Sequence, residues 1–208
     1  MIQIFNGCQP AGSCPILDDM HRVRKRVFVD ILKWNVPVIA GQYERDEFDT
    51  RDATYLVSAD ADGVHLGSFR LLRTDRPHLL GDRFAFLCDG AVPAGPDILE
   101  ITRGCLSPDL RAAERLRLRN RLISAAIDYG LAHGITAFTC VADSGWLGQI
   151  LAMGWDCRLL GTPQMIDGVA TGAVQIQLDA DTPRILAETG TYNPSGLTIV
   201  DKAEALAA

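Results

Sequence analysis

The feature that most constrains the fold is a long helical pattern between two apolar segments. Residues 110–132 carry apolar side chains at helical spacing, and His133-Gly134 then forms a stop signal. Segments 98–105 and 135–142, on either side, are predicted to be strands. The buried stripe of the helix is predicted to consist of Leu118, Leu122, Ala126 and Ile127. This order predicts an α/β (α+β) fold with a mixed central sheet flanked by helices, in a single domain.

Shorter patterns complete the predicted order. The other elements are a helix over 16–32, strands over 54–59 and 64–73, a helix over 147–153, strands over 155–160 and 173–179, and a short helix capped by Thr182. The apolar face of the first helix is predicted to consist of Ile16, Met20, Val23, Val27 and Ile31. Asp60 to Gly63 is predicted to be a hairpin turn, because Asp-Gly between two apolar runs is a hairpin signal. Residues 33–52 and 77–96 are predicted to be irregular.

Length and composition limit the classes of protein to which the chain can belong. A chain of 208 residues suits one domain, predicted over 1–190, followed by a C-terminal tail over 191–208. The net charge of −6 disfavours general nucleic-acid binding, because no global basic field exists to replace phosphate counterions. No apolar run is long enough to cross a bilayer and no signal peptide is evident, so we expect a cytoplasmic protein without membrane attachment. The six cysteines lack zinc-type spacing, and no metal site is expected.

Arg70 is a charged residue inside an apolar strand. Burying a guanidinium is unfavourable unless the charge is paired. The strand therefore predicts a carboxylate partner, and the candidates are Asp46, Asp49 and Glu100.

The first predicted helix and the loop after it combine charges with aromatic residues. Arg24 and Phe28 lie four residues apart and share a helix face, followed by Trp34. A guanidinium beside an aromatic side chain can hold a carboxylate and stack on an adenine or a sulfonium group. The acidic run that contains Asp46 and Asp49 can face these cations. Taken singly, each pattern is more often a solvated surface.

Glu100 and Arg103 lie inside the predicted strand 98–105. In a regular strand these two positions face opposite sides, and a bulge would bring them together. Glu100 is the best candidate for a general base, acting directly or through water.

A positive ridge opens the long helix. Arg111, Arg115 and Arg119 recur every four residues and suit a phosphopantetheine group or an acidic carrier protein. A plain solvated face is an equally good interpretation of this pattern.

Taken in order, these motifs resemble one family. The run R-x-x-x-F, W, E-x-D-x-[FY]-D, R-L-L-x-T and E-x-[ST]-R is similar to the acyl-homoserine lactone synthases, also called autoinducer synthases. The matching positions are Arg24 with Phe28, Trp34, Glu44 with Asp46 and Asp49, Arg70 to Leu72 with Thr74, and Glu100 with Thr102 and Arg103. The strong part of the resemblance covers residues 20–110.

The resemblance implies a fold like that of the GNAT N-acyltransferases. It implies S-adenosylmethionine as the acyl acceptor, a substrate rather than a cofactor, and no cofactor is expected. An acyl carrier protein or coenzyme A thioester is the implied donor, and 5′-methylthioadenosine the by-product. The implied acceptor-binding residues are Arg24, Phe28, Trp34, Asp46, Asp49, Arg70 and Thr102. Glu100 and Arg103 are the implied catalytic residues, and the arginine ridge is the expected donor site.

Two departures and two alternatives accompany this interpretation. Arg73 replaces a proline that is frequent in the family, and Gly104-Cys105 replaces an aromatic residue, so the acyl side is the less defined part. One alternative is a GNAT-type acyltransferase for another amine, but residues 107–114 lack the expected glycine-rich pyrophosphate loop. The other is a non-catalytic ligand-sensing or carrier-docking module, which ranks last because the charged motifs are intact.

Overall fold

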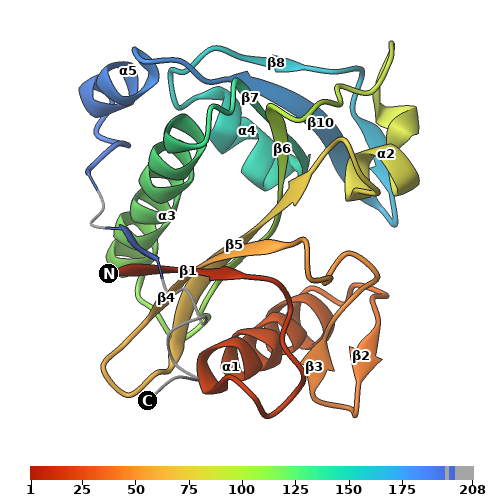
Figure 1. Cartoon of the computed structure of the whole chain (residues 1–208). Coiled ribbons are helices and arrows are strands. Elements are labelled where there is room, and N and C mark those ends of the chain that lie inside the picture. Colours follow the sequence, from red (N-terminus) through yellow and green to blue (C-terminus); the bar gives the residue numbers. More distant parts are fainter. Residues whose placement is uncertain (195–196, 200–208) are drawn as a thin grey trace. The chain divides into compact units, whose positions relative to one another are not determined.

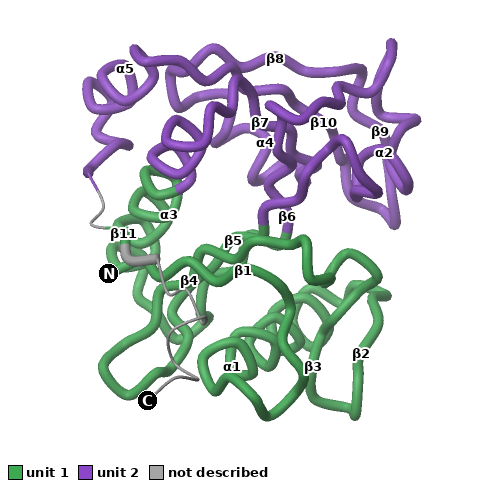
Figure 2. The backbone as a smooth tube through the Cα atoms, viewed as in Figure 1, with its two compact units in different colours: residues 1–70, 103–125, 195–208 green, residues 71–102, 126–194 purple. Residues whose placement is uncertain are grey.

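The computed structural model describes residues 1–194 and 197–199, which fall into two compact units (Figures 1 and 2). Unit 1 contains residues 1–70, 103–125 and the C-terminal strand, and unit 2 contains residues 71–102 and 126–194. Strands β5 (His65–Arg73) and β6 (Ile98–Leu106) and helix α3 (Ala112–Ala132) each contribute to both units. Neither unit is therefore a contiguous piece of the chain.

Unit 1 combines a sheet with one long helical segment and a small hairpin. Its further elements are β1 (Ile2–Asn6), α1 (Pro15–Arg24), the π-helix η1 (Lys25–Ile31), β2 (Val38–Ile39), β3 (Tyr43–Glu44), β4 (Thr54–Ala59) and β11 (Leu197–Ile199). Strand β1 pairs antiparallel with β4 and parallel with β11. Short β2 and β3 form a separate hairpin that leads into the acidic run.

Helix α1 continues without a break into η1. Pro15 occupies the start of α1, where a missing backbone N–H is harmless. The predicted helix over 16–32 is confirmed. Its predicted apolar face is only partly correct, because Met20 is buried whereas Ile31 is 52% exposed. The buried positions include Leu17, His21 and Arg24. Arg24 can be buried because Glu44 and Asp49 accept hydrogen bonds from its guanidinium.

Unit 2 contains both parallel and antiparallel strand pairs. Its further elements are α2 (Leu79–Arg83), the 3-10 turn η2 (Ala85–Leu87), β7 (Ala137–Asp143), α4 (Ser144–Leu151), β8 (Cys157–Leu159), β9 (Gln164–Ile166), β10 (Val169–Gln177) and α5 (Thr182–Glu188). Strand β6 pairs parallel with β7, and β10 pairs antiparallel with β7, β8 and β9. The sheet is thus mixed, as predicted.

The main predicted elements are confirmed, and short ones are the main omissions. The hairpin over 54–73 has the predicted turn, in which the Asp60 carboxylate accepts bonds from the backbone of Asp62 and Val64. The predicted stripe of α3 is buried. Helix α2 and the hairpin β2–β3 interrupt segments that were predicted to be irregular, and Thr182 is the first residue of α5 rather than its cap.

Within the predicted C-terminal tail, Leu197–Ile199 form β11, while residues 195–196 and 200–208 lie outside the described residues. The predicted boundary at residue 190 stays a prediction. No helix in the described part of the chain is both long and apolar enough to cross a membrane.

Candidate active site

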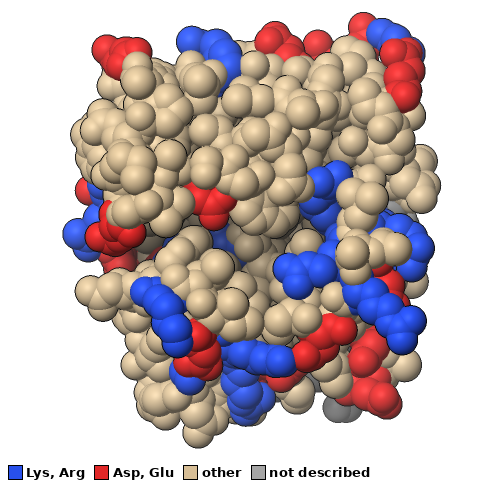
Figure 3. Space-filling model, turned by 180° about the vertical axis from the view of Figure 1, so that it is seen from behind, with Lys and Arg blue, Asp and Glu red and all other residues tan. Residues whose placement is uncertain are grey.

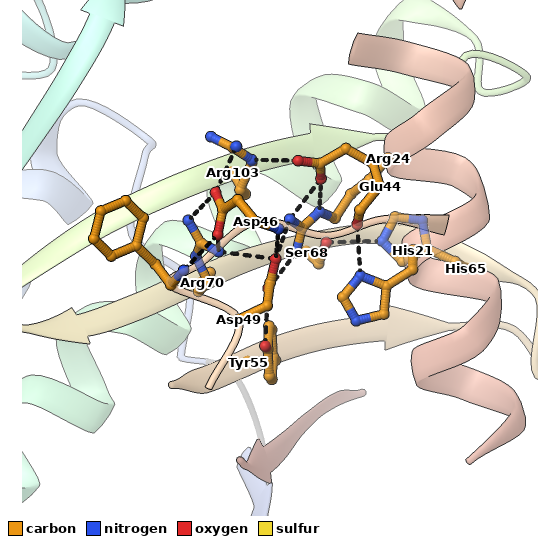
Figure 4. Close-up of polar contacts among 11 residues, drawn as sticks. His21, Arg24, Glu44, Asp46, Asp49, Tyr55, His65, Ser68, Arg70 and Arg103 are labelled. Carbon is orange, nitrogen blue, oxygen red and sulfur yellow. Dashed lines mark hydrogen bonds and ion pairs between the residues drawn. The ribbon is translucent and has the colours of Figure 1, made fainter. Parts of the chain in front are cut away.

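Charged side chains from separate stretches of unit 1 meet in one buried network (Figure 4). The members are Arg24 at the end of α1, Glu44 on β3, Asp46 and Asp49 in the following loop, Arg70 on β5 and Arg103 on β6. Their side chains are at most 8% exposed. The network therefore lies in a region of low dielectric, where each charge needs a partner.

Two of the carboxylates each bridge a pair of arginines. Glu44 accepts hydrogen bonds from Arg24 at 2.6 Å and from Arg103 at 3.1 Å. Asp46 accepts bonds from Arg103 at 2.6 Å and from Arg70 at 2.5 Å. Bonds of this charge-assisted kind are the strongest in proteins.

Asp49 closes the arrangement into a ring. Each of its carboxylate oxygens accepts a bond from Arg24 at 2.9 Å, and one lies 3.0 Å from Arg70. The Tyr55 hydroxyl donates a further bond to Asp49 at 2.9 Å. Arginines and carboxylates thus alternate around a closed cycle, which we call the charged ring: Arg24, Glu44, Arg103, Asp46, Arg70 and Asp49. Its formal charges cancel.

The environment keeps the ring ionised. Burial by itself raises the pKa of Asp49, but Arg24 and Arg70 outweigh it and hold that pKa well below its usual value. The pKa of Asp46 is lowered in the same way, chiefly by Arg70. Arg103 differs from the other cations, because burial lowers its pKa and the nearby carboxylates offset this only in part.

The charged ring confirms the prediction that Arg70 has carboxylate partners, and it contains one residue without a predicted role. Arg70 is paired with carboxylates, and the partners are Asp46 and Asp49 from the predicted set. Glu44 is part of the ring although the sequence indicated no separate role for it; its place at the start of the E-x-D-x-F-D motif was the available signal.

Two aromatic side chains lie beside the ring. The side chains of Phe28 and Trp34 stack at 4.8 Å with planes 5° apart. Phe28 is buried beneath the Arg103 guanidinium, which lies 5.8 Å from its centroid, whereas Trp34 is 41% exposed. The π-helical η1 places Phe28 here, and such helices are frequent at functional sites.

Arg103 departs from regular strand geometry. Its φ is +51°, a left-handed conformation that is unusual for a non-glycine residue. Two of its guanidinium nitrogens, Nε and Nη2, donate to the ring. Nη1 has no hydrogen-bond partner among residues 1–194 and 197–199, and Figure 4 shows the guanidinium at the margin of the ring.

Glu100 and Thr102 lie on β6 in unit 2, and both are buried. One oxygen of the fully buried Glu100 carboxylate accepts a hydrogen bond from the backbone N–H of Leu80 at 2.9 Å. The sequence offered no sign of this contact, because it joins a strand to a short helix in a segment that was predicted to be irregular.

The arginine ridge lies at the start of α3. Arg111 and Arg115 are exposed, whereas Arg119 is half-buried and donates to Asn120. On the face drawn in Figure 3, basic and acidic side chains are interspersed. Arg26 is paired with Asp109 at 2.6 Å, and both side chains are exposed. Among the described residues, no group of His, Cys, Asp and Glu side chains is arranged to hold a metal ion.

Comparisons with known proteins give consistent matches over most of the chain. A sequence model of the family described as autoinducer synthase matches residues 13–186. An acyl-homoserine-lactone synthase from Agrobacterium fabrum (strain C58 / ATCC 33970) is 30% identical over 182 residues, which cover 85% of this chain and 86% of that protein.

Solved structures agree with this match. TofI, in a ternary complex with an inhibitor and MTA, is 27% identical with a TM-score of 0.74, covering 93% of this chain and 98% of that one. BjaI, a CoA-dependent acyl-homoserine lactone synthase with SAM and isopentyl-CoA, has a TM-score of 0.84 at 23% identity, covering 100% and 97%. A putative N-acetyltransferase from Lactobacillus plantarum has a TM-score of 0.55 at 18% identity, covering 86% and 99%. The predicted fold of the GNAT N-acyltransferase type is thereby confirmed.

Proposed function

This chain belongs to the autoinducer synthase family, and we propose that it joins an acyl group to S-adenosylmethionine and releases an acyl-homoserine lactone. The second product is 5′-methylthioadenosine. The observation that carries the proposal is the charged ring, because motif residues that are far apart in the sequence come together there.

The acceptor is proposed to bind beside the ring at Trp34, Phe28 and Arg103. S-adenosylmethionine carries an adenine, a sulfonium and a carboxylate. The exposed indole of Trp34 suits adenine stacking, and Phe28 supports it from the other side. Nη1 of Arg103 is suited to hold the carboxylate, because an anion there would offset a cation that the ring leaves partly uncompensated.

The other predicted acceptor residues are proposed to support this site from behind. Each guanidinium nitrogen of Arg24 donates to Glu44 or Asp49, so Arg24 fixes the ring rather than the ligand. Arg70 and Asp46 have the same role. Thr102 precedes Arg103 on β6 and is buried, which makes it another supporting residue, and Asp46 additionally positions Arg103.

The first chemical step is amide formation. The acceptor amine, with a pKa of about 8 in its free form, must lose a proton before it attacks. Glu100 is proposed to take this proton, directly or through water. The neutral amine then forms a C–N bond with the thioester carbonyl carbon, and the C–S bond breaks. The nitrogen loses a second proton, and the departing thiolate takes up one proton to leave as the thiol. Backbone N–H groups near the distorted Arg103 are proposed to stabilise the oxyanion.

The second step is lactone closure. A methionine carboxylate oxygen attacks the γ-carbon of the same molecule, and the bond from that carbon to the sulfonium breaks. The sulfonium leaves as the neutral thioether 5′-methylthioadenosine. This step depends mainly on a folded-back substrate, so positioning by Trp34 and Arg103 is sufficient in principle.

The donor is proposed to be an acyl group on a phosphopantetheine arm, carried by an acyl carrier protein or by coenzyme A. The ridge of Arg111, Arg115 and Arg119 is the proposed contact, since both carriers are anionic. The reaction consumes S-adenosylmethionine as a substrate and is proposed to need no cofactor. We place the reaction in the cytoplasm, where both substrates are made.

The test is to incubate the purified chain with S-adenosylmethionine and a panel of acyl-coenzyme A and acyl-carrier-protein donors. We expect a lactone of defined mass and 5′-methylthioadenosine in equal amounts, and loss of both with Glu100→Gln in a folded protein. A fully active Glu100→Gln enzyme would overturn the role of Glu100. Acylation of another amine without methylthioadenosine would favour the first alternative, and ligand binding without any product would favour a non-catalytic module.

A further inference from the structure

We propose that the backbone amide of Leu80 is a positioning group for the reaction, because it holds the Glu100 carboxylate ionised and oriented. This inference rests on the proposed function. It assigns a role to the turn at the start of α2, which contains no residue of the charged motifs. The side chains and amide that carry it all belong to unit 2.

The contact itself is well formed. The Leu80 N–H donates to one carboxylate oxygen of Glu100 at 2.9 Å, and Glu100 is fully buried. Burial favours the protonated form of a carboxyl group, and a protonated carboxyl group cannot act as a base. A donated N–H bond acts in the opposite direction, because it stabilises the charged form. The amide therefore supplies the condition that the base requires.

Two titratable groups, Cys140 beside Glu100 and His78 in the turn with Leu80, do not supply this condition. Cys140 lies on β7, and burial, with the nearby Glu100 charge, raises the pKa of that thiol to about 12. The thiol is thus neutral at the pH of the reaction. His78, in the turn with Leu80, directs Nδ1 toward the Arg76 carbonyl at 2.8 Å. The amide of Leu80, by contrast, donates directly to the carboxylate.

Two packing features hold this amide in place. The Leu80 side chain is fully buried in an apolar cluster with Leu87 and Ala173. The buried imidazole of His78 packs against Gly81, where an added Cβ would lie 2.6 Å from its nearest carbon. A side chain at position 81 would therefore displace either the imidazole or the turn that carries the Leu80 N–H. The glycine is required by close approach and not by its backbone angles.

The direct test replaces the peptide bond before residue 80 by an ester, using the α-hydroxy acid equivalent of leucine. This change deletes the N–H and keeps the side chain. We expect the acid limb of the pH–rate profile for lactone formation to move upward by about one pH unit, because the base needs a higher pH to ionise. The KM for S-adenosylmethionine should stay the same, since the ester leaves the side chains that are proposed to bind it, Phe28, Trp34 and Arg103, unchanged.

A genetic test uses Gly81→Ala, with Gly90→Ala as the matched control, because a Cβ at position 90 meets no atom within 4 Å. Gly81→Ala should shift the acid limb in the same direction, and the double variant His78→Ala/Gly81→Ala should restore it by removing the clash. Gly90→Ala should behave like the unmodified chain.

The outcomes separate the two levels of the proposal. If the unmodified chain makes no lactone from any donor, the proposed function fails. If the unmodified chain is active and the ester variant has the same pH–rate profile, the positioning role of Leu80 is refuted while the function stands. A thermal melt on each variant shows which of them are folded, and the ester variant decides the question if Gly81→Ala does not fold.

Discussion

Replacement of Asp49 by asparagine is the sharpest test of the charged ring. Asparagine keeps the shape of the side chain but removes one negative charge, which leaves a buried surplus cation. Asp49 accepts two bonds from Arg24 at 2.9 Å and one from Tyr55, and it lies 3.0 Å from Arg70. Removing one partner of a buried ion pair destabilises a protein by roughly 3–5 kcal/mol. That is a large fraction of the 5–15 kcal/mol, roughly, by which a domain is stable.

The assay is urea unfolding at pH 7, followed by circular dichroism and tryptophan fluorescence, with the free energy of unfolding as the measured quantity. Glu188→Gln is the matched control, because it makes the same chemical change in an exposed pair with Arg184 on α5. We expect no measurable change in the control. Tyr55→Phe removes a hydrogen bond to Asp49 without removing a charge and should have an intermediate effect. If Asp49→Asn unfolds at the same urea concentration as Glu188→Gln, the ring does not stabilise unit 1.

Three further predictions concern pH, the acceptor and the donor. Burial lowers the pKa of His21 and of His65 to about 3 in the folded protein. As pH falls, these histidines are therefore protonated first in the unfolded state, from about pH 6.5 downward. The free energy of unfolding should then decrease by about 1.4 kcal/mol per pH unit for each histidine. Urea midpoints at several pH values check this, and a flat profile would contradict it. Trp34→Ala should raise the KM for S-adenosylmethionine about fivefold, since aromatic stacking contributes about 1 kcal/mol. An unchanged KM would exclude adenine stacking. Arg115→Glu should raise the KM for the acyl donor and leave that for S-adenosylmethionine unchanged, with Arg184→Glu as the control, and equal effects of the two variants would contradict a donor site on the ridge.

Sequence periodicity predicts helices and strands whose buried face consists of regularly spaced apolar side chains. Helix α3 and strand β4 have this pattern, and their positions are confirmed. The first helix does not follow it, because Arg24 and His21 are buried through polar partners while Ile31 is exposed. A pattern of apolar residues cannot identify a face that is buried by ion pairs.

The site shows the same division. The need to pair Arg70 follows from its place in an apolar strand, so its partners could be named in advance. The alternating order of the ring could not, because it depends on contacts between residues 20 to 59 positions apart. The contact from Leu80 to Glu100 is likewise a property of the folded turn, which carries no charged motif.

The closed form of the charged ring has a consequence for how the acceptor site is organised before a ligand arrives. Each ion is held by two neighbours, so the loss of one contact leaves every member still attached. The ring thereby connects α1, the acidic loop, β5 and β6 through ion pairs. A site that is already rigid loses little conformational entropy on binding. Amide hydrogen exchange in these segments should therefore be slow in the free protein and change little when S-adenosylmethionine binds.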